Sequence, residues 1–213
     1  MHLHLRANAA TCPSLQTYNR VEKIRGFFNK DDAMHFALLL GYQDIAGTKG
    51  DVLEIGSWFG RSTAFIASYI GANGRLIVCD AFELESRDQY HRRPNLAEFQ
   101  YNIKHCVPDF DLSRLLIYPC LSAQFEPPAD AQLRFAHIDG GHGYDEAMHD
   151  LRLVAELMVP GGVIVVDDFA HPRWPDVRRA VDAFLTEDPR FGLAASLNRW
   201  QATGQKAYIV RSL

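Results

Sequence analysis

Short apolar runs alternate with amphipathic segments along the chain from residue 52 onward. Apolar runs bounded by turn residues predict buried strands, whereas apolar residues three and four positions apart predict helices. The expected strands are residues 52–55, 75–79, 115–118, 133–138, 163–166, 191–197 and 207–210. The expected helices among them are residues 64–70, 95–106, 145–158 and 176–185.

Strands that alternate with helices through short turns are typical of an α/β fold with a mostly parallel sheet. We therefore predict a Rossmann-like, doubly wound, seven-stranded sheet with helices on both faces. No helix separates the last two strands, residues 191–197 and 207–210. These two are expected to form a terminal antiparallel hairpin.

Residues 1–47 precede the first strand and show no strand pattern. Asp31 and Asp32 stand before a segment with apolar residues near helical spacing, and Gly47 is a typical helix stop. One or two helices over the mouth of the sheet are expected. The pattern leaves open whether residues 1–47 are a substrate lid or a cover, while residues 48–213 would form the main domain.

Composition narrows the class of protein. A chain of 213 residues with 47% hydrophobic residues suits one α/β domain. The net charge of -4 and the lack of a basic stripe argue against a nucleic-acid partner. Four scattered cysteines favour a reducing compartment. Neither a signal-like nor a membrane-length apolar run occurs, so we expect a cytoplasmic protein without a membrane partner.

The segment Asp51–Thr63, DVLEIGSWFGRST, joins the first strand to the first helix of the sheet and breaks at Gly56 and Gly60. In a parallel sheet such a turn places backbone N–H groups and a positive helix end beside the carboxyl edge of the strand. A ligand with a carboxylate or phosphate tail fits there. The glycines would permit close approach, because a Cβ would occupy the ligand's space.

Two acids and the glycine spacing narrow the class of ligand that this turn could bind. The G-x-x-x-G spacing departs from the G-x-G-x-x-G of dinucleotide binders. Glu54 lies inside a strand where an apolar residue is usual, and Asp80 ends the second strand, where acids accept hydrogen bonds from ribose hydroxyls. The unit resembles motifs I and II of class I S-adenosylmethionine (SAM) methyltransferases. An ordinary strand–turn–helix unit with an incidental acid is the alternative.

A second acidic group follows two later strands. Asp139 comes after residues 133–138, while Asp167 and Asp168 come after residues 163–166. Neighbouring strands lie about 5 Å apart, so the three acids can converge. Carboxylates held that close repel one another unless a cation sits between them. Oxygen ligands suit Mg²⁺ first, then Mn²⁺ or Ca²⁺, whereas zinc-type cysteine and histidine spacing is missing.

His142 lies on the loop that follows Asp139. An unperturbed histidine pKa near 6.5 would let it accept a proton from a hydroxyl at neutral pH. Metal-bound Asp139 would be a poorer base, because the cation depresses its proton affinity. Alternatively, His142 orients Asp139 or caps the next helix. Asp145, immediately before that helix, is expected to be its cap.

The segments IDGGHGYDEAMHDL and GGVIVVDDF are similar to small metal-dependent O-methyltransferases of the macrocin O-methyltransferase type. Those enzymes carry I-D-G-x-H-x-Y-x-x-x-x-x-D and G-G-x-x-x-x-D-D. With the glycine loop, the resemblance covers roughly residues 51–169. It implies a SAM-dependent, divalent-metal-assisted O-methyltransferase. A phenol, a catechol or a sugar hydroxyl of a secondary metabolite would be the acceptor.

The resemblance also implies roles for individual residues. Asp139, Asp167 and Asp168 would bind the metal, Mg²⁺ in the first place, and Asp139 or His142 would be the base. The implied SAM contacts are Glu54, Gly56, Ser57, Gly60, Ser62, Asp80, Ser122 and Asp139. Residues 48–213 would be the methyltransferase domain. Residues 1–47 and 82–94, which would contact the acceptor, match no motif, so the acceptor stays open.

Two other functions are compatible with the sheet pattern. A nicotinamide-dependent oxidoreductase would bind a dinucleotide and would not need the aspartate trio; the G-x-x-x-G spacing argues against it. A SAM-binding module without turnover is the second, and the aspartates with His142 argue against that. The oligomeric state is open, with a homodimer the commonest assembly of soluble enzymes.

Overall fold

The computed structural model describes residues 12–71, 74–84, 94–199 and 202–213. The helices are α1 (Pro13–Val21), α2 (Lys30–Ala46), α3 (Arg61–Ala67), α4 (Leu96–Cys106), α5 (Tyr144–Leu157) and α6 (Pro175–Glu187). Short 3₁₀ turns are η1 (Phe82–Leu84), η2 (Leu112–Arg114) and η3 (Ser122–Gln124). The strands are β1 (Asp51–Ile55), β2 (Leu76–Asp80), β3 (Leu115–Pro119), β4 (Leu133–Ile138), β5 (Met158–Phe169), β6 (Phe191–Asn198) and β7 (Gln205–Arg211).

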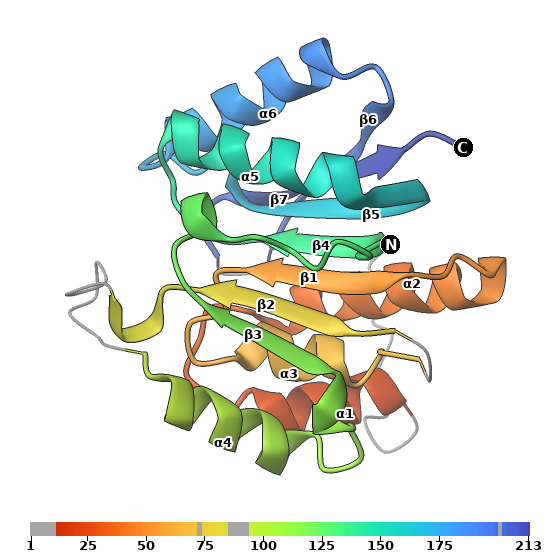
Figure 1. Ribbon diagram of the computed structural model, residues 1–213, viewed down its shortest axis with the longest axis vertical. Coiled ribbons are helices and arrows are strands. Elements are labelled where there is room, and N and C mark those ends of the chain that lie inside the picture. The colour runs from red at the N-terminus through yellow and green to blue at the C-terminus, as the bar shows by residue number, and fades with distance from the viewer. Residues whose placement is uncertain (1–11, 72–73, 85–93, 200–201) are drawn as a thin grey trace, which may run out of the picture.

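The strands form one seven-stranded sheet in the order β3-β2-β1-β4-β5-β7-β6. Strands β1 to β5 are parallel, and the arrows of β1, β2 and β4 end at the same edge in Figure 1. Strand β7 runs antiparallel to both β5 and β6. The predicted doubly wound sheet with a terminal antiparallel pair is confirmed. The strand order reverses between β1 and β4, where sheets of this kind form a ligand crevice.

Helices cover both faces of the sheet (Figure 1). Helices α5 and α6 pack into one hydrophobic core and helices α1 to α4 into the other. The central strand β1 is buried along its whole length, as expected for a parallel strand covered on both sides. Helix α2 reaches the sheet through Phe36, whose ring lies 5.1 Å from those of Phe135 and His137. The helices expected before residue 47 therefore belong to one of the two cores.

The turn between α1 and α2 is bound to the start of α3. Arg61 donates to the backbone oxygens of Glu22 at 3.1 Å, Phe28 at 3.3 Å and Ile24. Asn29 then caps α2 by accepting hydrogen bonds at its side chain. This part of the chain is thereby held next to the glycine loop.

Two local expectations need comment. The expected cap of α5 is wrong: Gly143 is the N-cap, and the Glu146 carboxylate accepts from its N–H at 3.0 Å, so Asp145 lies in the first turn. A glutamate three residues past the cap can reach back in this way. Residues 82–94, which match no motif, begin with η1, and residues 85–93 lie outside the described residues. No helix in the described ranges is long and apolar enough to cross a membrane.

Candidate active site

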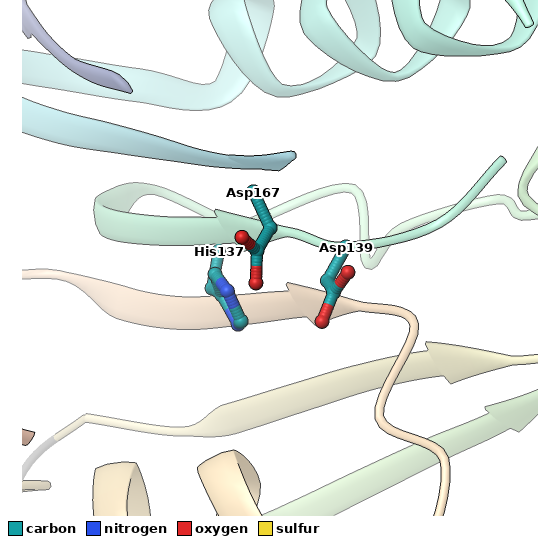
Figure 2. A group of neighbouring side chains, drawn as sticks. All are labelled: His137, Asp139 and Asp167. Carbon is teal, nitrogen blue, oxygen red and sulfur yellow. The ribbon is translucent and has the colours of Figure 1, made fainter. Parts of the chain in front are cut away.

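The predicted acids meet at the carboxyl ends of β4 and β5, beside the point where the strand order reverses. Asp139 directly follows β4, and Asp167 belongs to the neighbouring strand β5. Figure 2 shows these two side chains gathered with His137 of β4. Ligand atoms of Asp139, Asp167 and His137 lie within 4.8 Å of one another, and so do those of Asp139, His142 and Asp168. Asp139 is common to both groups, and the metal roles stay predictions.

Two cations of the protein hold Asp167. Lys206 of β7 is fully buried and donates to Asp167 Oδ2. Arg199 forms an ion pair with Oδ1 at 3.1 Å and donates to Oδ2 at 3.5 Å. The backbone N–H of Asp168 donates to Oδ1 at 2.7 Å. Burial opposes ionisation, but the charges of Lys206 and then Arg199 hold the pKa of Asp167 below its ordinary value. Asp167 is therefore a carboxylate at neutral pH.

The charged cluster continues to the first strand. Lys206 Nζ lies 3.0 Å from His137 Nε2, and His137 Nδ1 lies 2.9 Å from Glu54 Oε1. Glu54 is fully buried and also accepts a hydrogen bond from the Thr63 hydroxyl. Because an ammonium only donates, His137 accepts at Nε2 and donates at Nδ1. The structure turns Glu54 toward Thr63 and His137, and its contact with a cofactor stays a prediction.

Among the described acids of this cluster, Asp139 stands out because its side chain has no protein partner. Within the described residues, its carboxylate accepts no hydrogen bond and forms no ion pair with a lysine or arginine. Burial and then the nearby Asp167 carboxylate raise the pKa of Asp139 well above its usual range, against the opposing charge of Lys206. Unsatisfied carboxylate oxygens in such a place favour a bound cation or a hydrogen-bond donor.

His142 is fixed at its edge and on its face. Its Nε2 lies 2.9 Å from Asp168 Oδ2, and its ring stacks on Trp174 with centroids 4.5 Å apart. A carboxylate only accepts, so Nε2 carries a proton, and Nδ1 is the nitrogen that can accept when the ring is neutral. Asp168 has a φ of 53°, a left-handed backbone that is uncommon outside glycine. Such backbones cluster at functional sites.

The glycines of the loop after β1 are required by the protein itself. Gly56 and Gly60 have φ of 81° and 85°, which favours glycine. A Cβ on Gly56 would overlap the backbone oxygen of Asp139, and one on Gly60 would lie 2.8 Å from the ring of Phe99. From the sequence alone, these glycines are explained by the approach of a ligand. The structure shows that neighbouring chain segments already leave no room for a Cβ at either position. Their contact with SAM stays a prediction.

Asp80, at the end of β2, fixes the same loop. Its Oδ2 accepts from the N–H groups of Ser57 at 2.6 Å and Trp58 at 2.8 Å, and its Oδ1 from that of Phe82 at 2.7 Å. Burial raises the pKa of Asp80, and these backbone bonds oppose the shift. Ser57 and Ser62 are both buried. Asp80 therefore has a structural role beside its predicted contact with the ribose.

Ser122 begins η3, which packs against α5. Its backbone oxygen lies 3.1 Å from His149 Nε2. Asp150, the next residue of α5, is fully buried. Burial raises the pKa of Asp150 to about 6, and the neighbouring Ser122 hydroxyl opposes the shift. The cofactor contact of Ser122 stays a prediction.

Three residues of this centre are missed by the sequence analysis: Lys206, Arg199 and Trp174. Lysine and arginine are almost never fully buried, so the two cations are expected at the surface when the sequence alone is considered. The one available signal is that Lys206 directly precedes the apolar run of the last strand. Trp174 carries no signal, because a lone tryptophan before a helix is common.

Comparison with known proteins identifies the family of the chain. A family model described as "Methyltransferase domain" matches residues 53–169, more than half of the chain. None of the curated proteins matches the chain. The solved structure of the O-methyltransferase NovP is 16% identical, covers 84% of this chain and 79% of its own, and has a TM-score of 0.69.

Two further solved structures are similar. An O-methyltransferase from Bacillus cereus in complex with SAH is 18% identical, with 93% of this chain and 89% of that chain covered and a TM-score of 0.65. CalS11, a TDP-rhamnose 3'-O-methyltransferase of calicheamicin biosynthesis, is 17% identical, with 94% and 95% covered and a TM-score of 0.64. The chain therefore belongs to the methyltransferase-domain family, and its resemblance to class I SAM-dependent methyltransferases is confirmed.

Proposed function

We propose that this protein transfers a methyl group from SAM to the oxygen of a small hydroxylated molecule, with a divalent cation beside that oxygen. One observation carries the proposal. The carboxylates of Asp139 and Asp168 come together at the ends of β4 and β5, beside the point where the strand order reverses, and neither forms an ion pair with a lysine or arginine of the described chain. A crevice at this point of a doubly wound sheet is the usual ligand site.

The residues present fit a divalent cation. The carboxylates around the crevice, those of Asp32, Glu54, Asp139, Asp167 and Asp168, outnumber the permanent cations Lys206 and Arg199. Burial, and after it the Asp167 carboxylate, raise the pKa of Asp139, and a bound cation would favour its ionised form. Oxygen ligands with at most one histidine suit Mg²⁺ or Mn²⁺.

The residues of the acidic cluster have distinct tasks in this proposal. Asp139 and Asp168 would hold the cation, with Asp167 as the third ligand that the family resemblance implies. A bound divalent cation lowers the pKa of an acceptor hydroxyl and fixes its oxygen. His142 accepts the released proton at Nδ1, because its Nε2–H is held by Asp168. Stacking on Trp174 keeps that ring in place.

The loop after β1 and the end of β2 would hold the methyl donor. SAM supplies an electrophilic methyl group on a good leaving group, so the protein mainly has to keep the acceptor oxygen in line. Such positioning is worth about 7–11 kcal/mol. The proposed contacts are Glu54, Gly56, Ser57, Gly60, Ser62, Asp80, Ser122 and Asp139.

The proposed acceptor is a phenol, a catechol or a sugar hydroxyl of a secondary metabolite. NovP and CalS11 are described as O-methyltransferases, and CalS11 as one that acts on TDP-rhamnose. These descriptions support oxygen as the acceptor atom. A homodimer, a cytoplasmic location and a covering role for residues 1–47 are proposals carried over from the sequence.

The proposal is tested with the full chain, SAM, Mg²⁺ and a panel of phenols, catechols and nucleotide sugars. We expect methyl transfer that stops in chelator and returns with Mg²⁺, and a heat of SAM binding in calorimetry. Asp139→Asn should lower turnover at least about 100-fold, because a neutral amide replaces an anionic ligand. Asp145→Asn, a first-turn acid of α5 outside the cluster, is the matched control and should keep its activity.

His142→Ala, in the same assay, should slow transfer about 10²–10⁴-fold while SAM affinity stays unchanged. Two results would count against the proposal. Methyl transfer that persists in the presence of chelator and in the Asp139→Asn variant would exclude a role for the metal. Binding of a nicotinamide dinucleotide without binding of SAM would exclude the methyltransferase function.

A further inference from the structure

The Asp167 carboxylate is already engaged by the protein. Its Oδ1 accepts from the N–H of Asp168, and its Oδ2 accepts from Lys206 and, at 3.5 Å, from Arg199. A second nitrogen of Arg199 forms an ion pair with Oδ1 at 3.1 Å. A metal ion on Asp167 would have to compete with these donors and with two buried positive charges.

Neither cation can leave Asp167 easily. Lys206 is fully buried, and its other contact is His137 Nε2 at 3.0 Å. Arg199 is nearly as buried, and its second acid, Asp32, is 3.7 Å away. A metal that replaced either donor on Asp167 would leave a buried positive charge with weaker pairing, which is strongly unfavourable.

In contrast to Asp167, Asp139 and Asp168 keep carboxylate oxygens that no described residue occupies. The Asp139 carboxylate accepts no hydrogen bond from the described residues, and Asp168 uses Oδ2 for His142 and keeps Oδ1 open. Ligand atoms of these three residues lie within 4.8 Å of one another. Asp139 and Asp168 therefore carry the carboxylate oxygens of the cluster that are open to a ligand.

We propose that the Lys206 ammonium occupies the place that an ion would take on Asp167, so that Asp167 is a positioning residue and the ion is held by Asp139 and Asp168. This inference rests on the proposed metal-assisted function and changes its ligand set. Asp167 acts on the site through the backbone. By accepting the N–H of Asp168, it helps to hold the left-handed φ of 53° from which the Asp168 carboxylate reaches His142.

The test is Mn²⁺ binding by the full chain, followed by electron paramagnetic resonance without any turnover. Asp139→Asn and Asp168→Asn each replace an anionic ligand by a neutral amide and should weaken binding at least about 100-fold, beyond the 10–100-fold typical of outer-shell changes. The decisive variant is the double substitution Asp167→Asn with Lys206→Gln. It removes one negative and one positive charge, and it can keep the hydrogen bonds to Asp168 and Arg199.

We expect the double variant to stay within about tenfold of the wild-type Mn²⁺ affinity. A loss as large as that of Asp168→Asn would overturn the inference and would leave the metal-assisted function standing. Wild-type protein that binds no Mn²⁺ would overturn both. If the double variant does not fold, anomalous scattering from wild-type crystals soaked in Mn²⁺ decides. A peak bonded to Asp139 and Asp168 supports the inference, and one bonded to Asp167 refutes it.

Discussion

Lys206 is the residue on which most of the buried charges depend. Its ammonium is fully buried and contacts Asp167 and His137, and the charges of Asp167, Asp32 and Asp139 raise the pKa of Lys206 despite its burial. An isolated ammonium in this place would lose its proton. The charge persists because carboxylates surround it, and they in turn need it.

Replacing Lys206 by methionine should therefore destabilise the protein by about 3–5 kcal/mol, since it leaves Asp167 with an uncompensated part of its buried charge. Urea unfolding at pH 7 measures the change. Arg152→Met is the matched control, because its ion pair with Glu187 joins side chains that are 61% and 48% exposed. That pair should contribute less than about 1 kcal/mol. Equal losses in both variants would show that Lys206 is not paired as described.

At the residue scale, sequence reasoning finds the acids and misses their partners. Asp139, Asp167 and Asp168 each follow an apolar run, and ends of neighbouring parallel strands meet at one edge. Lys206 and Arg199 reach Asp167 from the terminal hairpin. Their burial depends on the pairing of β7 with β5, which the residues around them do not reveal.

At the element scale, α5 carries a buried acid against η3. Asp150 is fully buried, and burial raises its pKa from an ordinary 3.8 to about 6. The unfolded chain releases this proton more readily than the folded chain does. Above pH 6 the folded state therefore loses up to about 3 kcal/mol through this group, and the loss shrinks as the pH falls toward 4.

Asp150→Asn removes this titration. Relative to wild type, its free energy of unfolding should fall by about 1–1.5 kcal/mol between pH 7.5 and pH 5, because wild type recovers stability as Asp150 takes up its proton. Urea unfolding of both proteins at the two pH values gives the difference. Asp145→Asn, on the same helix, should show no such change. A constant difference between Asp150→Asn and wild type would place the Asp150 pKa near its ordinary value.

Element boundaries were predictable where an apolar run ends at a turn residue. Strand β4 coincides with the expected residues 133–138, and β1 begins one residue earlier than expected. Strand β5 starts well before residue 163, because Pro160, Gly161 and Gly162 belong to the strand and not to a turn between it and the preceding helix. A register shift between β4 and β5 accommodates them. No local pattern announces such a shift.

At the scale of the whole molecule, α2 is joined to the sheet along its length. Phe36 and Leu40 are fully buried, and Gln43 donates to the backbone oxygen of Arg134 in β4 at 2.5 Å. The Arg134 side chain in turn forms an ion pair with Asp44 of α2 at 2.7 Å. The sequence left open whether this region is a lid or a cover. Bonds of this kind to a central strand favour a cover, which would not detach during a catalytic cycle.

Hydrogen exchange tests this interpretation on the full chain. If α2 is a fixed cover, the amides of Phe36 and Leu40 should exchange within about tenfold of those of β1, a difference in opening free energy below about 1.4 kcal/mol, with or without SAM. The edge strand β6, whose Leu193 is 42% exposed, serves as the faster reference. A lid would instead exchange as fast as β6 in the free protein and slow down when SAM binds. Opening of such a lid would also move Asp32, at the start of α2, away from Arg199 and so disrupt the buried charged cluster.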